Sequence, residues 1–264
     1  MTAADGLAFA RRGYQCAAAA WADDAELVYG PLADALLACA PELTGQLVMD
    51  VGAGTGAVSH RLVAAGARAV AVDASWSMLA HQASSRPPAV VGDISRLPLV
   101  DDAVDGAAAA FVLNHLADPV AALVEMRRVV RRGGFIVASV FSTADPPAAK
   151  AAIDDVLAAA GWEPPEWYRF LKSVDAQLGS AASMRAAARA AGLQHVEVVE
   201  RPVRTGVTDP RDIVRYRLSQ PQRALFLTGL SEETRRRVID ECVAVVTELG
   251  AAFDPGVVLL AARS

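Results

Sequence analysis

Carboxylates and glycines gather around one short apolar run near residue 50. Residues 50–56 read DVGAGTG and directly follow the apolar residues 47–49. Glycines at the end of a strand let a ligand approach the backbone N–H groups, because no side chain stands in the way. Two further acids, Asp73 and Asp93, each follow another short apolar run. In doubly wound sheets ligands bind at the carboxyl ends of the strands, so this set predicts a site for a nucleoside-like ligand.

The glycine spacing and the acid before it indicate which ligand is favoured. A dinucleotide fingerprint requires G-x-G-x-x-G, whereas residues 52–56 read G-x-G-x-G. Asp50 lies two residues before the first glycine. A carboxylate there repels a pyrophosphate and attracts a ligand that carries an amino group and a cationic sulfur. The pattern therefore favours S-adenosylmethionine over NAD, and it disfavours a nicotinamide-dependent oxidoreductase.

The two later acids fit the remaining parts of the same ligand. Asp73 lies 19 residues beyond Gly54, at the end of the second apolar run, where a carboxylate can accept both ribose hydroxyls. Asp93 ends the third run, where it can accept from an adenine amino group while Ile94 packs on the ring. The alternative is that these acids are loop residues and helix caps. Three acids at matching strand ends beside a glycine turn favour the binding site.

The surrounding sequence predicts the elements that position these residues. Between residues 46 and 142, short apolar runs alternate with helical patterns. This alternation is typical of a parallel sheet with helices on both faces. The predicted strands are 47–51, 69–72, 89–91, 104–112 and 135–140, and the predicted helices are 57–65, 76–84 and 119–130.

After residue 142 the alternation becomes irregular. Helical patterns cover 148–160, 181–191 and 232–249, and two further strands are predicted at 195–201 and about 257–263. We expect one integrated domain with four parts. These are an N-terminal helical lid (1–45), a nucleoside-binding core (46–142), cap helices (143–194), and the last two strands with a helical insertion (195–264).

Three segments carry a family resemblance. VMDVGAGTG at 48–56, AVDAS at 71–75 with Met78-Leu79, and GDISRLPL at 92–99 resemble the motifs of class I S-adenosylmethionine-dependent methyltransferases. The resemblance is to the quinone-biosynthesis-type and small-molecule branch, and it covers 46–142 densely. It implies an α/β fold with a Rossmann-like, doubly wound, seven-stranded, mostly parallel sheet. The last strand would be antiparallel, and helical insertions would form a lid.

The resemblance also implies which residues hold the cofactor, whose product after methyl transfer is S-adenosylhomocysteine. Tyr14, on the predicted lid, resembles a tyrosine that closes over the cofactor, although a packing role fits it equally well. The other implied cofactor residues are Asp50, Gly52, Ala53, Gly54, Asp73, Ala74, Ser75, Met78, Asp93, Ile94, Phe111 and Asn114.

Methyl transfer makes few demands on catalytic side chains. The enzyme mainly aligns the nucleophile with the methyl group and excludes water. A general base helps only where the nucleophile must lose a proton. His115, after the fourth predicted strand, is the best candidate base, but a structural role for the 114–116 segment is the stronger alternative. No group of His, Cys or Asp has metal-ligand spacing, so no metal site is expected.

Aromatic residues cluster after the fifth predicted strand. Four of them fall within nine residues: Trp162, Trp167, Tyr168 and Phe170. A cap lined by these rings, joined by Trp21 of the predicted lid, suits a flat, largely apolar acceptor or an amine. Ordinary packing of the inserted helices explains the cluster equally well. Glu166 could hold a cationic amine or act as a base.

Charge and composition limit the partners. The net charge is −5, whereas a nucleic-acid binder needs a basic face, so no nucleic acid is expected. Arg127, Arg128, Arg131 and Arg132 are interpreted as a solvated helix end rather than a phosphate patch. No run of about 18 apolar residues is present, and the three cysteines are scattered without a CxxC pair. We therefore expect a soluble, cytoplasmic protein that does not enter a membrane.

The acceptor is the least determined part of this hypothesis. The chain has 23 arginines but only two lysines, Lys150 and Lys172, a bias typical of a high-GC genome. Together with a catalytic domain that shows no carrier or receptor module, this bias favours secondary-metabolite biosynthesis. Open alternatives are a non-methyl reaction such as cyclisation on the same cofactor, and a quinone or carrier-linked acyl acceptor. The methylated atom (N, O or C) and a homodimeric state also stay open.

Overall fold

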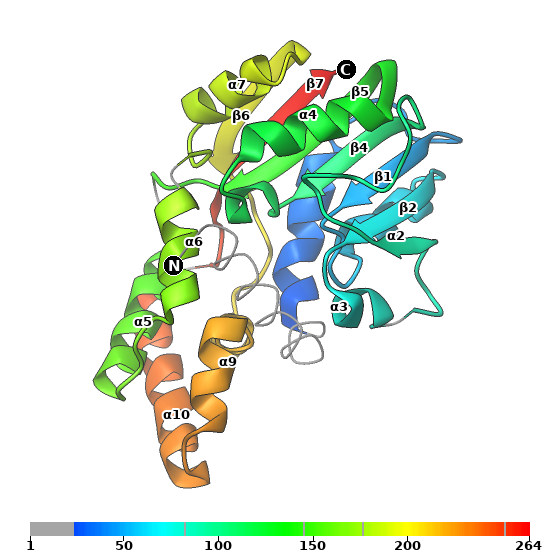
Figure 1. The fold of residues 1–264 in the computed structure, drawn as a ribbon. Coiled ribbons are helices and arrows are strands. Elements are labelled where there is room, and N and C mark those ends of the chain that lie inside the picture. Colours follow the sequence, from blue (N-terminus) through cyan, green and yellow to red (C-terminus); the bar gives the residue numbers. More distant parts are fainter. Residues whose placement is uncertain (1–23, 82, 145, 176, 251) are drawn as a thin grey trace.

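A seven-stranded sheet forms the centre of the molecule (Figure 1). The computed structural model describes residues 24–264 except 82, 145, 176 and 251. The strand order is β3-β2-β1-β4-β5-β7-β6, and only β7 runs antiparallel to its neighbours β5 and β6. This confirms the predicted fold class. The strands are β1 (Leu47–Val51), β2 (Arg68–Asp73), β3 (Ala89–Val91), β4 (Val104–Ala110), β5 (Val130–Phe141), β6 (Gln194–Pro202) and β7 (Gly256–Arg263).

Helices cover both faces of the sheet because its strands are apolar on both sides. In β1, Val48 belongs to the apolar cluster on one face and Met49 to the cluster on the other. The first cluster includes the helical residues 24–37 and α2 (Ala57–Ala64). The second includes α4 (Pro119–Val129) and α7 (Ala181–Ala190). The described part of the predicted N-terminal lid thus belongs to the core packing. The short helix α3 (Trp76–Ala80) contacts β2 and β3.

The start of β5 differs from the sequence-based prediction. We expected a helix over 119–130 that ends at Gly133-Gly134, with a strand from 135. The helix does begin as predicted, with Asp118 accepting from the amide of Ala121 at 2.9 Å. It ends one residue earlier, and β5 begins at Val130 with an irregularity in its pairing to β4. The two glycines lie inside this irregular part, and Gly133 has a φ of 76°, a conformation that glycine adopts readily.

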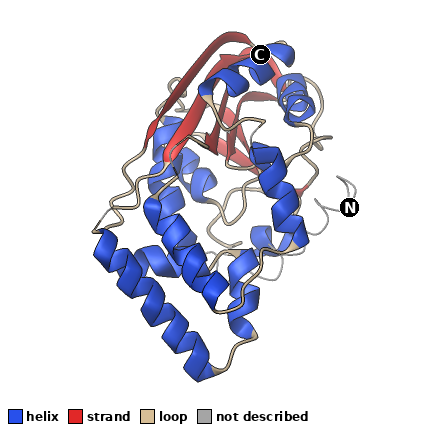
Figure 2. Cartoon of the chain, turned by 90° about the vertical axis from the view of Figure 1, so that its left-hand side faces the viewer, coloured by secondary structure: helices blue, strands red, loops and turns tan. Residues whose placement is uncertain are grey.

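A group of helices extends beyond the carboxyl ends of the strands (Figure 2). The helix α10 packs on α5 and α8, and α6 packs on the short 3-10 helix η1 that follows β4. The apolar side chains of α5, α8, α9 and α10 join the same cluster as residues 24–37. The helices are η1 (Leu113–His115), α5 (Ala148–Ala159), α6 (Glu166–Asp175), α8 (Pro210–Leu218), α9 (Pro221–Thr228) and α10 (Glu232–Leu249).

The arginines near the end of α4 pair with nearby acids. Arg128 forms salt bridges with Glu125 and Asp101, each at 2.8 Å, and Arg131 forms one with Asp105 at 2.6 Å. These contacts fit the interpretation as a helix end, since two of the four arginines are paired locally with acids. Among the described residues, no helix combines the length and the apolar character that a membrane span requires.

The strand β4 is built from small residues, and the ring of Phe135 on the neighbouring strand β5 lies against one of them. Its residues Ala107, Ala108 and Ala109 are fully buried, and a Cβ on Gly106 would overlap the ring of Phe135. Filling a packed core in this way destabilises a protein. We expect Gly106→Ala to lower the free energy of unfolding by about 1–3 kcal/mol, measured by urea denaturation.

A matched control for this substitution is Gly229→Ala. A Cβ there would lie 3.4 Å from its nearest neighbour, and the residue has a helical φ of −81°. The control variant should stay within about 0.5 kcal/mol of the parent chain. Equal stability of the Gly106→Ala variant and the control would contradict the packing argument.

Candidate active site

A large cavity opens where β1, β2 and β4 end. It has a volume of about 470 Å³ and is walled on one side by residues of the helical segment 24–37. Among the described residues that line it, four carry a carboxylate and none is a lysine or an arginine. The four acids are Glu26, Asp50, Asp73 and Asp93. The cavity therefore favours a cationic ligand over an anionic one.

The glycine turn after β1 forms the floor of this cavity. Gly52 has a φ of 70°, and a Cβ there would lie 2.5 Å from Cγ2 of Val112. The amides of Gly52 and Ala53 donate to the carbonyl of Val72 at 2.8 and 3.1 Å. The turn is thus fixed against β2, and only glycine meets both its conformation and its close contact. These constraints bring bare backbone to the cavity surface.

Asp50 is buried beside this turn. Its Oδ2 accepts from the hydroxyl of Ser59 at 2.6 Å. Burial raises the pKa of Asp50 to about 6, and the nearby charge of Asp73 adds to this, whereas the Ser59 hydrogen bond and Arg86 oppose it. The ionised carboxylate is therefore costly in the free protein. A cationic group in the cavity would stabilise it.

Asp73 ties two parts of the site together. Its Oδ2 accepts from the amide of Gly54 at 2.8 Å, and its Oδ1 accepts from the amide of Ser75 at 2.7 Å. Ser75 in turn caps α3 by accepting from the amide of Met78 at 3.4 Å. Both oxygens thus have backbone donors, which the sequence-based account did not foresee. A carboxylate oxygen can accept two hydrogen bonds, so the predicted ribose contact remains compatible with this arrangement.

Arg86 also fixes the glycine turn, and sequence reasoning missed it. Its guanidinium donates to the carbonyl of Gly54 at 3.2 Å and to that of Met78 at 3.3 Å. Burial lowers the pKa of Arg86, and the charges of Asp50 and Asp73 counteract this. Arg86 lies in the loop between α3 and β3, outside every recognised motif. The two prolines that follow Arg86 mark the end of the preceding helix in the sequence, but they do not indicate a role for the arginine.

Most of the predicted cofactor residues come together in this cavity. Asp93 is exposed, and its Oδ1 accepts from the amide and the hydroxyl of Ser95 at 2.8 and 2.7 Å, while Ile94 is buried. Asn114 lines a second cavity instead. Tyr14 and Trp21 lie outside the described residues. The predicted residues that line the large cavity are Asp50, Gly52, Ala53, Gly54, Asp73, Ala74, Ser75, Met78, Asp93, Ile94 and Phe111.

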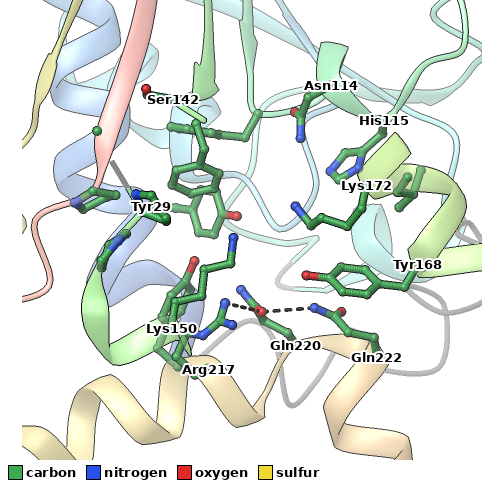
Figure 3. A pocket seen from close by; sticks show the side chains of 18 of the residues that line it. Tyr29, Asn114, His115, Ser142, Lys150, Tyr168, Lys172, Arg217, Gln220 and Gln222 are labelled. Atoms are coloured by element: carbon green, nitrogen blue, oxygen red, sulfur yellow. Dashed lines mark hydrogen bonds between the residues drawn. The ribbon is translucent and has the colours of Figure 1, made fainter. Parts of the chain in front are cut away.

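The second cavity adjoins the first and has a volume of about 100 Å³ (Figure 3). Tyr29, Phe111 and His115 line both cavities, so we call these three residues the junction. Phe111 follows β4 with a φ of 55°, which is unusual for an aromatic residue. Its ring contacts Tyr29 edge-on at 5.3 Å and Phe141 at 4.4 Å between centroids. Sequence reasoning identified two of the junction residues and missed Tyr29.

The structure places two residues of the predicted aromatic cap in the wall of the second cavity. Trp167 and Tyr168 line the second cavity, and Glu166, Trp162 and Phe170 do not. Trp162 is buried elsewhere and donates from Nε1 to the carbonyl of Gln222 at 3.0 Å.

Glu166, which the sequence suggested as a base or as a partner for a cationic amine, does not line either cavity. It is exposed in the first turn of α6. The helix turns Trp167, Tyr168 and Leu171 toward the cavity, and helical periodicity then directs Glu166 away from it. Three cationic residues that the prediction did not include line the cavity instead: Lys150, Lys172 and Arg217.

Comparisons with known proteins agree with this arrangement. Residues 49–138 match a family model described as "Methyltransferase domain". A demethylmenaquinone methyltransferase of Mycolicibacterium paratuberculosis is 46% identical over 99 residues, which are 38% of this chain and 43% of that protein. The chain thus aligns with less than half the length of this curated relative.

Two solved structures share the fold. Phosphoethanolamine N-methyltransferase 2 of Haemonchus contortus, in complex with phosphomonomethylethanolamine and S-adenosylhomocysteine, aligns at a TM-score of 0.55 and 18% identity. The alignment covers 88% of this chain and 52% of that one. The cyclase SpnF aligns at a TM-score of 0.56 and 21% identity, over 89% of this chain and 81% of that one. These likenesses show the fold alone.

The raised pKa of Asp50 generates a prediction on stability. The pKa lies near 6 in the folded chain, against a usual 3.8, so the folded state binds more protons than the unfolded state between these values. Ionised Asp50 therefore destabilises the fold, increasingly so as the pH rises from 4 to above 6. We expect Asp50→Asn to raise the free energy of unfolding by up to about 3 kcal/mol at pH 8 and by about 1 kcal/mol at pH 4.5.

Urea denaturation at both pH values measures this difference. Asp93→Asn is the control, because Asp93 is exposed and its substitution should change stability by less than about 0.5 kcal/mol. A destabilised Asp50→Asn variant at pH 8, or a gain that grows toward acid pH, would refute the account.

Proposed function

Residues 49–138 match the model of a methyltransferase domain, and from this premise we propose that the chain is a class I S-adenosylmethionine-dependent methyltransferase that methylates a small acceptor bound in the second cavity. The observation that carries the proposal is the junction. Tyr29, Phe111 and His115 separate an acidic cavity of cofactor size from a smaller cavity among the inserted helices. A methyl group has to cross only this boundary.

The large cavity fits S-adenosylmethionine by its chemistry. Buried Asp50 supplies negative charge for the cationic part of the cofactor. Asp73 is placed for the ribose, and Asp93 with Ile94 for the base. The described lining has no lysine or arginine to balance a pyrophosphate, which disfavours a nicotinamide dinucleotide. When bound, S-adenosylmethionine supplies an electrophilic methyl group and a neutral leaving group.

The side chains of the chain itself position the acceptor and keep water out. The acceptor atom has to lie at the junction, because the described walls of the two cavities have only these three residues in common. The buried ring of Phe111 and the ring of Tyr29 leave little room for water at that point. His115 is partly buried and lines both cavities. It is placed to accept a proton if the nucleophile is a hydroxyl group.

The acceptor is a small, largely apolar or aromatic compound of secondary metabolism. Aromatic rings from several elements support the apolar part, since Tyr29, Phe111 and Phe141 pack around one corner of the cavity. The family match ends at residue 138, before the helices α5 and α6 that carry much of the cavity wall. The quinone acceptor named for the mycobacterial relative is therefore the alternative rather than the first choice.

A second candidate keeps the cofactor and changes the reaction. The fold that the chain shares with the cyclase SpnF is compatible with a cyclisation in which the cofactor has a structural role. The two proposals differ in their product, because methyl transfer releases S-adenosylhomocysteine with each turnover. A cyclase would bind the cofactor and leave it intact.

Calorimetric titration tests the cofactor assignment. We expect S-adenosylhomocysteine to bind with a dissociation constant in the micromolar range, about −8 kcal/mol, and NADH to show no binding. Asp73→Ala should weaken the affinity by at least about 30-fold, since it loses the ribose contact and loosens the glycine turn. Asp240→Ala, exposed on α10, is the control and should bind as the parent chain does.

The opposite pattern would overturn the assignment. Tighter binding of NADH than of S-adenosylhomocysteine would indicate that the large cavity is a dinucleotide site. Unchanged affinity in a folded Asp73→Ala variant would show that the ligand does not use the carboxyl end of β2.

A further inference from the structure

Both lysines of the chain lie in the second cavity. The sequence has 23 arginines and only two lysines, and Lys150 of α5 and Lys172 of α6 both line this space. Figure 3 shows their amino groups pointing into the same central region from two different helices. Arginine serves nearly everywhere else in the chain as the cation. The two compact, flexible ammonium groups are thus concentrated at one site.

Every lysine, arginine or acid among the described lining residues of this cavity is a cation. Lys150, Lys172 and Arg217 line it, and none of the described lining residues carries a carboxylate. Behind the wall, Asp154 accepts from Arg223 at 2.9 and 2.5 Å and reaches Arg217 only at 3.4 Å. One carboxylate therefore serves two buried guanidinium groups. Among the described residues, the three cations that line the cavity outnumber the one carboxylate that reaches them.

Arg217 is held by a neutral amide oxygen as well as by the distant carboxylate of Asp154. It is buried, and its Nη1 donates to the side-chain carbonyl of Gln220 at 2.9 Å. Among the described residues, its Nε has no hydrogen-bond partner. The same Gln220 oxygen also accepts from the guanidinium of Arg223 at 2.6 Å and from the side-chain amide of Gln222 at 3.1 Å. This network orients the guanidinium without neutralising it.

Lys150 has an unfavourable environment for a cation. No salt bridge joins it to a described residue, since every described ion pair involves an arginine. Burial lowers its pKa to about 8, and repulsion from Lys172, Arg217 and Arg223 adds to the effect. A bound anion would reduce the repulsion between these cations and would stabilise the charged form of Lys150.

We propose that the acceptor carries an anionic oxyacid group, carboxylate or phosphate, which is bound between Lys150, Lys172 and Arg217. This inference rests on the proposed function, because it assigns the substrate class of the same cavity. The apolar part of the acceptor then lies toward Phe111 and Tyr29, where the methyl group arrives. The acidic cofactor cavity repels the anionic end and so fixes the orientation.

The cation cluster has one competing explanation, in which neutral Lys150 acts as a general base. The two roles respond differently to Lys150→Arg. An arginine keeps the positive charge and binds an anion, but it cannot give up its proton at neutral pH. Binding that survives this substitution assigns Lys150 to the anion.

Lysine-selective labelling provides a direct measurement. Because the chain has two lysines, ¹³Cε-lysine gives two NMR signals, and Lys172→Met assigns them. With S-adenosylhomocysteine present, we expect benzoate or phenyl phosphate to shift both signals and to raise the pKa of Lys150 from about 8 by about one unit. Benzamide, which has the shape of benzoate without its charge, should leave the pKa unchanged.

Several charged and titratable groups surround Lys150, and their own titration also changes its NMR signal. The anion-induced shift can be separated from their own titration because benzamide serves as the neutral reference under the same conditions. The groups are Asp154 on its own helix, Tyr168 and Lys172 on α6, Tyr216 and Arg217 on α8, Arg223 on α9, His115 on η1 and Tyr29.

Calorimetry on matched variants gives the second measurement. At constant ionic strength, Lys150→Met should weaken benzoate binding at least about 10-fold, and Lys150→Arg should stay within about threefold of the parent. Arg236→Gln, exposed on α10, is the control for net charge and should have no effect. Lys150→Met should also raise the melting temperature by roughly 2–6 °C at pH 7, because a half-buried cation with no described salt bridge is removed.

The outcomes separate this inference from the proposed function. If S-adenosylhomocysteine binds, but benzamide binds as well as benzoate and phenyl phosphate, the anion site is refuted while the methyltransferase proposal stands. Loss of anion binding in Lys150→Arg also overturns it and favours the base. Anion binding at the lysines without S-adenosylhomocysteine binding supports the site and defeats the proposed function. The tighter of benzoate and phenyl phosphate identifies the group as carboxylate or phosphate.

Discussion

Two cavities of opposite charge meet at one aromatic boundary, and the rest of the site is organised around that boundary. The acids Asp50, Asp73 and Asp93 lie on the cofactor side, and Lys150, Lys172 and Arg217 lie on the other. The acidic side belongs to the parallel strands, whose carboxyl ends meet at a single edge. The basic side belongs to helices inserted after β5. A ligand that bridges the two sides is thus oriented by charge before any specific contact forms.

The boundary depends on unusual local backbone. Phe111 has a positive φ of 55° directly after β4, and its amide donates to the carbonyl of Ser139 on β5 at 2.8 Å. Such a conformation disfavours a bulky side chain and persists only where the surroundings fix it. Here the rings of Tyr29 and Phe141 enclose the side chain. The strained residue sits where the methyl group is proposed to cross.

Sequence alone predicted the core well, because strand alternation and the glycine–acid motif are local signals. The family resemblance implied the seven strands with the last one antiparallel, and eleven of the residues that it assigned to the cofactor line the large cavity. The second cavity was predicted poorly, since its wall is assembled from α5, α6, α8 and the helical segment 24–37. No spacing rule connects Lys150, Arg217 and Tyr29. The same limit explains Glu166, which sequence proximity to the aromatic cluster suggested and helical periodicity directs outward.

A crystal structure of the chain with S-adenosylhomocysteine and benzoate tests the central claim most directly. We expect the sulfur atom at the junction of Tyr29, Phe111 and His115, the ribose at Asp73, and the benzoate carboxylate between Lys150 and Lys172. The aromatic ring of the benzoate should face the sulfur. Density for the nucleoside outside the acidic cavity, or benzoate turned with its carboxylate toward the sulfur, would contradict the account.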